Sequence, residues 1–151
     1  MAIRMKTSVK LRVSAHCPSH SRADIKVRDV GLVIDEPEAR GGTNMGPTPT
    51  DTAIAAFVGC VNVIGNKCAE KMGIDIGHLD IDAESEFDRR GVTLAEEIEV
   101  PFTSVTLTVH ANGSASQEDL TRVGLETEKF CPLSKLFRAA GTKVEVNWQK
   151  A

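Results

Sequence analysis

The chain has 151 residues, a length typical of one domain, and we predict a single domain over residues 1–151. An apolar fraction of 41%, a charged fraction of 26% and a net charge of −3 exclude the basic footprint of a nucleic-acid-binding protein. The N-terminal segment has no continuous apolar run of the kind found in secretory signals. We therefore expect a cytoplasmic protein whose thiols stay reduced unless they carry redox chemistry.

The first part of the chain is predicted to form three strands. Residues 7–15 and 22–29 alternate between apolar and polar side chains, and a third apolar segment covers residues 31–34. The short connections between them favour an antiparallel meander. The next segment, residues 35–49, has three glycines and three prolines. Because unstructured loops of more than about 12 residues are usually functional or disordered, we predict a functional loop, with a plain surface crossover as the alternative.

Residues 48–73 carry the start and stop signals of one long helix. Thr48 is placed to be the N-cap, Pro49 suits the first helical position, and Asp51 completes a capping-box pattern. Gly73 follows the last good helix former and is placed to end the helix in the left-handed conformation.

The middle of this helix, residues 53–64, contains no charged side chain and is apolar on nearly every face. This uncharged segment is too short to span a membrane, so we predict a buried central helix. Cys60 lies at its centre. Judged by the residues alone, a free cysteine in such surroundings is more often a small core residue than a nucleophile, and a thiolate there would need a nearby cation.

The rest of the chain predicts two more strands, a helix and a last strand. The strands cover residues 74–88 and 100–110, the helix begins at Ser116, whose side chain fits the N-cap position, and the last strand covers residues 143–148. The element order βββ-α-ββ-α-β indicates an α+β domain.

Pro132 must kink or restart the second helix, because proline removes a helical hydrogen bond. If the helix restarts, Cys131 is its N-cap, where unpaired N–H groups and the helix dipole favour a thiolate. Three cations nearby in the sequence, Lys129, Lys135 and Arg138, add to the positive field if they point inward. From the residues alone, Cys131 is therefore the more reactive of the two thiols.

The other two cysteines predict no metal centre. Cys17 and His20 form one close pair of possible ligands, but the sequence has no second pair at the right spacing to complete a tetrahedral site. We read Cys17 as a solvated loop residue. Cys68 lies about two helical turns after Cys60, and we predict that it packs in the core.

Two segments carry a family resemblance: RGGTNMGPTPTDTAIAAFVGC, which ends at Cys60, and KFCPLSKLFRAAGTKVEVNW, which contains Cys131. They resemble the two signature regions of the OsmC/Ohr superfamily, the osmotically inducible protein C and organic hydroperoxide resistance proteins. The resemblance extends from about Arg22 to Trp148. It implies an OsmC-like fold, in which an intertwined homodimer packs long buried central helices against curved antiparallel sheets, with active sites at the subunit interface.

The resemblance also implies a thiol-dependent peroxidase that reduces organic hydroperoxides to alcohols without a cofactor. The position of Cys60 matches the cysteine that attacks the peroxide and becomes a sulfenic acid, and Cys131 matches the one that resolves it as a disulfide. A dithiol such as a lipoylated protein would then reduce the disulfide. Phe57, Gly59 and Pro49 are expected to line the substrate pocket.

In the Ohr branch an arginine pairs with the thiolate and a glutamate holds that arginine. Arg22 is the best match for the arginine and Arg40 competes with it. Thr50 stands where the Ohr glutamate would be, whereas Asp51 matches the acid of the broader OsmC-like branch. Asp51 is therefore either the residue that holds an arginine or only the capping-box acid of the helix.

Two other functions stay open. The same dimer could be a non-catalytic or weakly catalytic module that binds an apolar small molecule in its interfacial pocket, as the threonine at position 50 and the apolar surroundings of Cys60 suggest. A structural dimer with inert cysteines is the third interpretation. Neither predicts a membrane or nucleic-acid partner.

Overall fold

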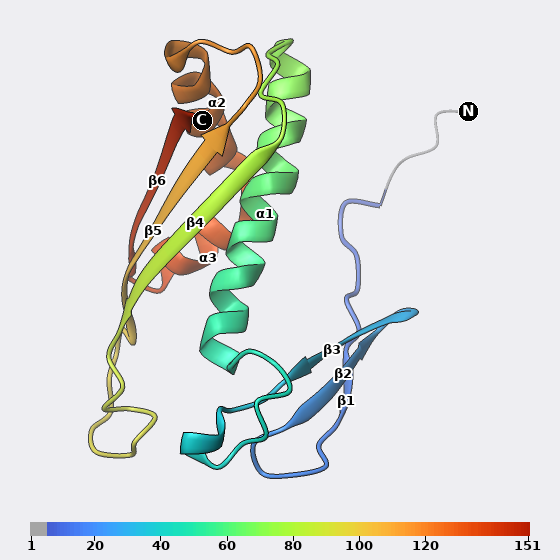
Figure 1. Ribbon diagram of the computed structural model, residues 1–151, viewed down its shortest axis with the longest axis vertical. Helices are drawn as coiled ribbons and strands as arrows, with labels where there is room; N and C mark the ends of the chain where they lie inside the picture. Colours follow the sequence, from blue (N-terminus) through green and yellow to red (C-terminus); the bar gives the residue numbers. More distant parts are fainter. Residues whose placement is uncertain (1–5) are drawn as a thin grey trace. The chain divides into compact units, whose positions relative to one another are not determined.

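The computed structural model of the protein describes residues 6–151, which separate into two compact units with a boundary between Thr52 and Ala53 (Figure 1). Residues 6–151 form two small sheets and three α-helices, which confirms the predicted α+β class. That the whole chain behaves as one domain stays a prediction.

The first unit contains a three-stranded antiparallel sheet of order β1-β2-β3, which confirms the predicted meander. Its strands are β1 (Ser14–His16), β2 (Ala23–Val27) and β3 (Val30–Ile34).

The strand predicted over residues 7–15 is wrong for residues 7–13, because only its last two residues belong to β1. The alternation is real, but no strand among the described residues pairs with this segment. Its apolar side chains Val9, Leu11 and Val13 are 78%, 88% and 64% exposed. A pleated pattern specifies which side chains share a face, and a strand also needs a neighbour to accept its hydrogen bonds.

The long loop that follows β3 is built around the buried carboxylate of Asp35. One carboxylate oxygen accepts a hydrogen bond from the Glu36 N–H at 2.8 Å. The other accepts from the Thr43 hydroxyl at 2.6 Å, the Thr43 N–H at 3.1 Å and the Met45 N–H at 3.2 Å. These bonds, the Thr43 hydroxyl first, hold the pKa of Asp35 well below its ordinary value although burial opposes them. A short 3₁₀-helix, η1 (Glu38–Arg40), lies inside this ordered loop.

Helix α1 (Pro49–Met72) begins and ends where the sequence predicts. The Asp51 N–H donates to the Thr48 side-chain oxygen at 3.1 Å, and the Thr48 hydroxyl donates to the Asp51 carboxylate at 2.6 Å. Gly73 ends the helix with φ of 67°. These contacts confirm the capping box and the left-handed terminator.

The expectation that α1 is buried on all sides is wrong for the single chain. Its buried residues all belong to one face: Phe57, Val61, Gly65, Cys68 and Ala69. Val63 is 50% exposed on another side, because the elements of one chain cover only part of a helix this long. Length and composition would also allow the whole 24-residue helix to cross a membrane. Core helices of soluble proteins pass the same test, so this property alone assigns no location.

The second unit contains a three-stranded sheet of order β4-β5-β6 together with two shorter helices. These elements are β4 (Leu79–Phe87), β5 (Phe102–Ala111), α2 (Gln117–Phe130), α3 (Pro132–Ala139) and β6 (Lys143–Lys150). Strands β4 and β5 are antiparallel, whereas β5 and β6 are parallel. The expectation of a purely antiparallel sheet is thus wrong here, because α2 and α3 form the crossover that returns the chain to the same end.

The core of this unit is closed by Trp148 of β6, which lies against two glycines. A Cβ atom on Gly65 of α1 would lie 2.5 Å from the indole, and one on Gly124 of α2 would lie 2.6 Å from it. Val105, Leu107 and Val109 of β5 are fully buried in the same core. The two helices can approach the indole closely only because both positions lack a side chain.

A new helix begins at Pro132, which confirms a restart of the helical segment as opposed to a kink. Ser116 caps α2, with the Asp119 N–H donating to its hydroxyl oxygen at 3.1 Å. Cys131 ends α2 and is the N-cap of α3, in which proline occupies the first turn. Gly141, with φ of 93°, follows the last turn of α3.

Candidate active site

The fold brings Cys60 and Cys131 together although 71 residues separate them in the sequence. Their sulfur atoms are 3.1 Å apart, and the Cys131 thiol donates a hydrogen bond to the Cys60 sulfur. Both cysteines are free thiols. A disulfide has a sulfur–sulfur distance of about 2.05 Å, so a movement of about 1 Å would join them.

Cys131 lies where α2 meets α3 and is completely buried. Its sulfur accepts a hydrogen bond from the Ser134 N–H at 3.4 Å, and its own N–H donates to the Thr127 carbonyl at 2.9 Å. Burial nevertheless raises the pKa of the Cys131 thiol to about 11, and the neighbouring Cys60 adds to the rise while the Ser134 N–H opposes it.

This environment overturns the choice of Cys131 as the more reactive thiol. The helix N-terminus is present, as predicted, but the loss of water outweighs it. Two of the cations expected nearby are also already paired. The Lys129 amine lies 2.8 Å from the Glu126 carboxylate, and the Arg138 guanidinium lies 3.1 Å from Glu128.

Cys60 lies in the middle of α1 and is only half-buried, so it is the more accessible of the two sulfurs. Phe57, almost one turn earlier, is fully buried and stacks on Phe137 with ring centroids 5.5 Å apart. Gly59 is exposed, and a Cβ atom there would meet nothing within 4 Å. Residues two apart on a helix face different directions. That Phe57 and Gly59 line one substrate pocket stays a prediction, because the expected pocket lies at a subunit interface.

Both candidate arginines make ion pairs inside the first unit. The Arg22 guanidinium donates to Asp24 at 2.7 Å, and this bond raises the pKa of Arg22. Arg40 lies 3.0 Å from the Glu36 carboxylate. That either arginine approaches Cys60 stays a prediction.

Asp51 and its neighbours form the start of α1. The Asp51 carboxylate accepts the Thr48 hydroxyl hydrogen bond, and Thr50 lies 3.0 Å from the same hydroxyl. No arginine of residues 6–52 makes an ion pair with Asp51. Within the first unit the structure therefore shows Asp51 in its capping role, and its role in holding an arginine stays a prediction, as does the place of the exposed Pro49 in a substrate pocket.

The remaining cysteines differ in exposure. Cys17 is exposed and Cys68 is buried. Among residues 6–151, no group of three His, Cys, Asp or Glu side chains is arranged to hold a metal ion. The contacts of Ser134 and Thr127 with Cys131 were not predicted from the sequence. Ser134 lies three residues after the N-cap cysteine, and this helical spacing could have indicated its contact with Cys131.

Comparison with protein families gives one match. The sequence pattern of the OsmC-like protein family matches residues 42–147, most of the chain and both cysteines of the pair. A comparison with curated protein sequences gives no match.

Solved structures share the fold at low sequence identity. An OsmC-like protein from Mycoplasma pneumoniae has a TM-score of 0.80 at 14% identity, over 95% of this chain and 98% of that one. An organic hydroperoxide resistance protein OsmC from Legionella pneumophila has a TM-score of 0.65 at 17% identity, over 97% of this chain and 99% of that one. The organic hydroperoxide resistance protein OhrB of Bacillus subtilis has a TM-score of 0.64 at 20% identity, over 93% of this chain and 98% of that one.

A family match over most of the chain and the fold of these solved structures together show that the chain belongs to the OsmC-like protein family.

Proposed function

We propose that the protein reduces organic hydroperoxides to alcohols with Cys60 as the attacking thiol and Cys131 as the resolving thiol. The observation that carries this proposal is the 3.1 Å distance between the two free sulfur atoms. Membership in the OsmC-like family supports it, as do the names of related structures, which are organic hydroperoxide resistance proteins.

The difference in burial supports the order of the two thiols. Cys131 is completely buried and its pKa of about 11 keeps it protonated at neutral pH, so it is a poor first nucleophile. Cys60 is half-buried and accepts the hydrogen bond of the Cys131 thiol. Cys60 is therefore the sulfur that a hydroperoxide can reach first.

In the first step the Cys60 thiolate attacks the distal oxygen of the hydroperoxide. The S–O bond forms as the O–O bond breaks, and the alkoxide leaves and takes a proton to become the alcohol. Cys60 is oxidised by two electrons to a sulfenic acid, and the hydroperoxide is reduced by two electrons.

In the second step the Cys131 sulfur attacks the Cys60 sulfur. The S–S bond forms, the S–O bond breaks, and the sulfenic oxygen leaves as water with the proton of the Cys131 thiol. Since the two sulfurs already lie 3.1 Å apart, no rearrangement of the helices is needed. A dithiol such as a lipoylated protein then exchanges with the disulfide and restores both thiols. This cycle fits a cytoplasmic location and uses no cofactor.

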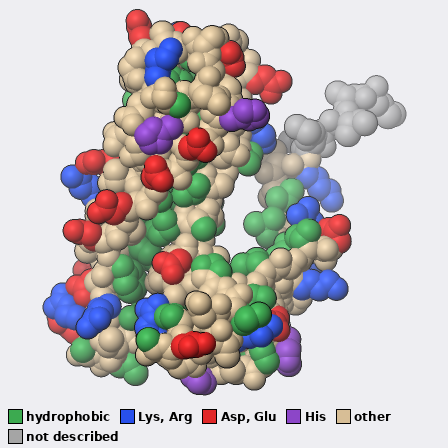
Figure 2. All heavy atoms as spheres, in the orientation of Figure 1, with side chains coloured by type: hydrophobic (Ala, Val, Ile, Leu, Met, Phe, Trp, Pro, Cys, Tyr) green, Lys and Arg blue, Asp and Glu red, His purple; other side chains and the backbone are tan. Residues whose placement is uncertain are grey.

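We further propose that the active form is a homodimer. Val9, Leu11 and Val13 alternate on an extended segment that has no strand neighbour among the described residues, and all three are exposed. Apolar side chains are also exposed on both units in Figure 2. An exposed apolar strand is a template for pairing with another chain, and a second copy would supply the missing neighbour.

The test is stopped-flow consumption of cumene hydroperoxide by the wild type, Cys60→Ser and Cys131→Ser. We expect Cys60→Ser to lose turnover, and Cys131→Ser to complete one turnover and accumulate a sulfenic acid that dimedone traps. Cys17→Ser is the matched control and should behave as the wild type, since Cys17 is an exposed thiol to which this mechanism gives no role.

Equal rates for the wild type and Cys60→Ser would remove Cys60 from the mechanism. Saturable binding of the hydroperoxide without its consumption would favour the small-molecule-binding module instead. Mass spectrometry after substoichiometric hydroperoxide should show a Cys60–Cys131 disulfide.

A further inference from the structure

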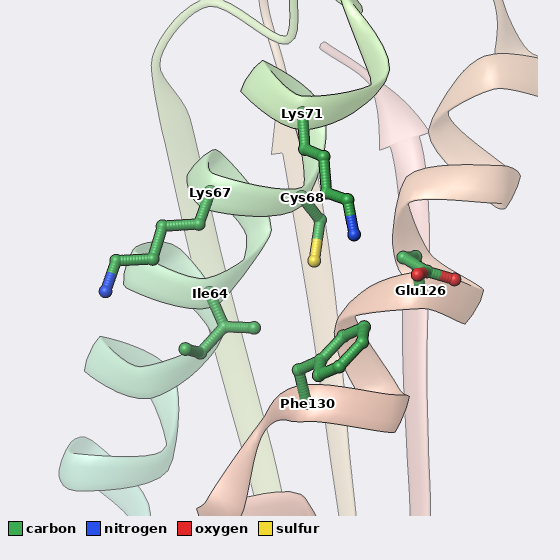
Figure 3. A pocket seen from close by; sticks show the side chains of 6 residues that line it. All are labelled: Ile64, Lys67, Cys68, Lys71, Glu126 and Phe130. Carbon is green, nitrogen blue, oxygen red and sulfur yellow. The ribbon is translucent and has the colours of Figure 1, made fainter. Parts of the chain in front are cut away.

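A pocket lies in the groove between α1 and α2. It has a volume of about 260 Å³ and is lined by Ile64, Lys67, Cys68, Lys71, Glu126 and Phe130. Neither Cys60 nor Cys131 lines it. Figure 3 shows the Cys68 sulfur and the Lys71 amine pointing into the space between the helices, with Ile64 and Phe130 along its wall and Lys67 extending away from it.

The apolar part of the pocket suits the body of a small molecule. Ile64 and Phe130 provide aliphatic and aromatic contact surface, and the Cys68 side chain, 6% exposed, forms part of the lining. The volume lies just below the range of about 300–1,000 Å³ typical of small-molecule sites, so the matching ligand is short.

The charge of the pocket favours an anion. Glu126 is the only acid in the lining, and the Lys129 amine already neutralises it at 2.8 Å. The pKa of Glu126 is lowered, by Lys129 first and also by Lys71. No carboxylate of residues 53–151 lies within ion-pair distance of the Lys67 or Lys71 amine, so both amines can still pair with an anion.

Lys71 is the lysine placed to use that charge. Its amine lies 6.0 Å from the centre of the Phe130 ring, beside the apolar wall of the pocket. A ligand whose anionic group lies beside Lys71 would place its apolar chain against Phe130 and Ile64. Lys67 belongs to the same lining but points away from the pocket (Figure 3). It carries the same charge as Lys71 without the same position, so a Lys67 variant serves as the control.

We propose that this pocket binds a small amphipathic carboxylate, with the carboxylate on Lys71 and the apolar chain over Ile64, Phe130 and Cys68. The site is separate from the thiol pair and does not depend on the peroxidase proposal.

The test uses octanoate as the probe and the alkylation of Cys68 in the intact protein as the readout, followed by peptide mass spectrometry. We expect octanoate to slow alkylation of Cys68 in a saturable way and to leave alkylation of Cys60 unchanged. The neutral analogue 1-octanol should protect clearly less. Lys71→Met should weaken octanoate binding about three- to tenfold, the range of a partly exposed charge-assisted contact, whereas Lys67→Met should change it less than twofold.

Three results would overturn the proposal: equal protection by octanoate and 1-octanol, unchanged affinity in Lys71→Met, or parallel protection of Cys60, which would place the probe at the thiol pair. Because Cys68 is buried and reacts slowly, the methyl NMR signals of Ile64 provide a second readout in the same titration. The absence of a saturable shift there would count equally against the site.

Discussion

The Cys131 thiol donates a hydrogen bond to the Cys60 sulfur across 3.1 Å, from a fully buried helix junction to the middle of a half-exposed helix. The pair is asymmetric because the two sulfurs differ in burial. The burial of Cys131 leads to two pH-dependent predictions.

Cys131 should react slowly with iodoacetamide at neutral pH. With its pKa at about 11, only about one molecule in ten thousand carries the thiolate at pH 7. Its rate should rise about tenfold for each pH unit up to about 11, and peptide mass spectrometry after timed alkylation measures it. Exposed Cys17 provides the comparison within the same sample. A Cys131 rate that levels off below pH 9 would contradict the effect of burial.

The same shift has a consequence for stability. A raised pKa means that the fold prefers the neutral thiol. Its stabilising contribution is therefore complete below the ordinary pKa of 9.0 and is lost as the pH rises toward about 11. Urea unfolding at pH 8 and pH 10.5 should show a larger loss for the wild type than for Cys131→Ala, in which this group no longer titrates.

Two glycines of α1 should respond to alanine with opposite signs. Gly65→Ala would push a methyl group into the Trp148 indole and should cost about 1–3 kcal/mol of unfolding free energy. Gly59→Ala meets no atom within 4 Å in this chain and should gain about 0.5–1 kcal/mol from helix propensity. Urea unfolding of the two variants measures both effects. A destabilising Gly59→Ala would show that another chain or a ligand lies against this position.

Asp35 should order its loop only while it is ionised. Four hydrogen bonds hold its pKa below the ordinary 3.8, so their contribution is present above that pH and is lost as the pH falls below it. Asp35→Asn should therefore reduce hydrogen-exchange protection at the Thr43 and Met45 amides at pH 7. Exposed Asp29→Asn is the matched control. Unchanged protection in Asp35→Asn would show that the loop is held by other contacts.

The capping box of α1 should behave as a coupled pair. Thr48→Ala and Asp51→Ala should each cost about 0.5–2 kcal/mol, because each removes a partner of the hydrogen bonds at the helix start. In a double-mutant cycle the losses should be less than additive. Fully additive losses would mean that the two residues act through separate contacts.

The arginine that activates Cys60 is best identified kinetically. If Arg22 supplies the cation, Arg22→Met should slow sulfenic acid formation by about tenfold or more, the effect of losing a close opposite charge. Arg40→Met removes a guanidinium from the same unit and should have a smaller effect. Stopped-flow mixing with a hydroperoxide in the Cys131→Ser background isolates this step. The reverse order of effects would assign the role to Arg40.

Local signals in the sequence predicted much of the fold. The boundaries of α1 follow from Thr48, Pro49 and Gly73, and the restart at Pro132 follows from the missing N–H of proline. These features depend on side chains and backbone groups within a few residues of one another. For the same reason, the strand predicted over residues 7–13 is wrong, because an alternating pattern contains no information about a partner strand.

The sequence by itself determined where the helices begin and end, the order of the elements and the family to which the two cysteine segments belong. Only the tertiary structure decided that Cys60 and Cys131 lie 3.1 Å apart, and that burial rather than the helix N-terminus controls the pKa of Cys131. The reason is physical. Caps and turns are short-range contacts along the chain, whereas the loss of water around a thiol depends on every distant element that packs against it.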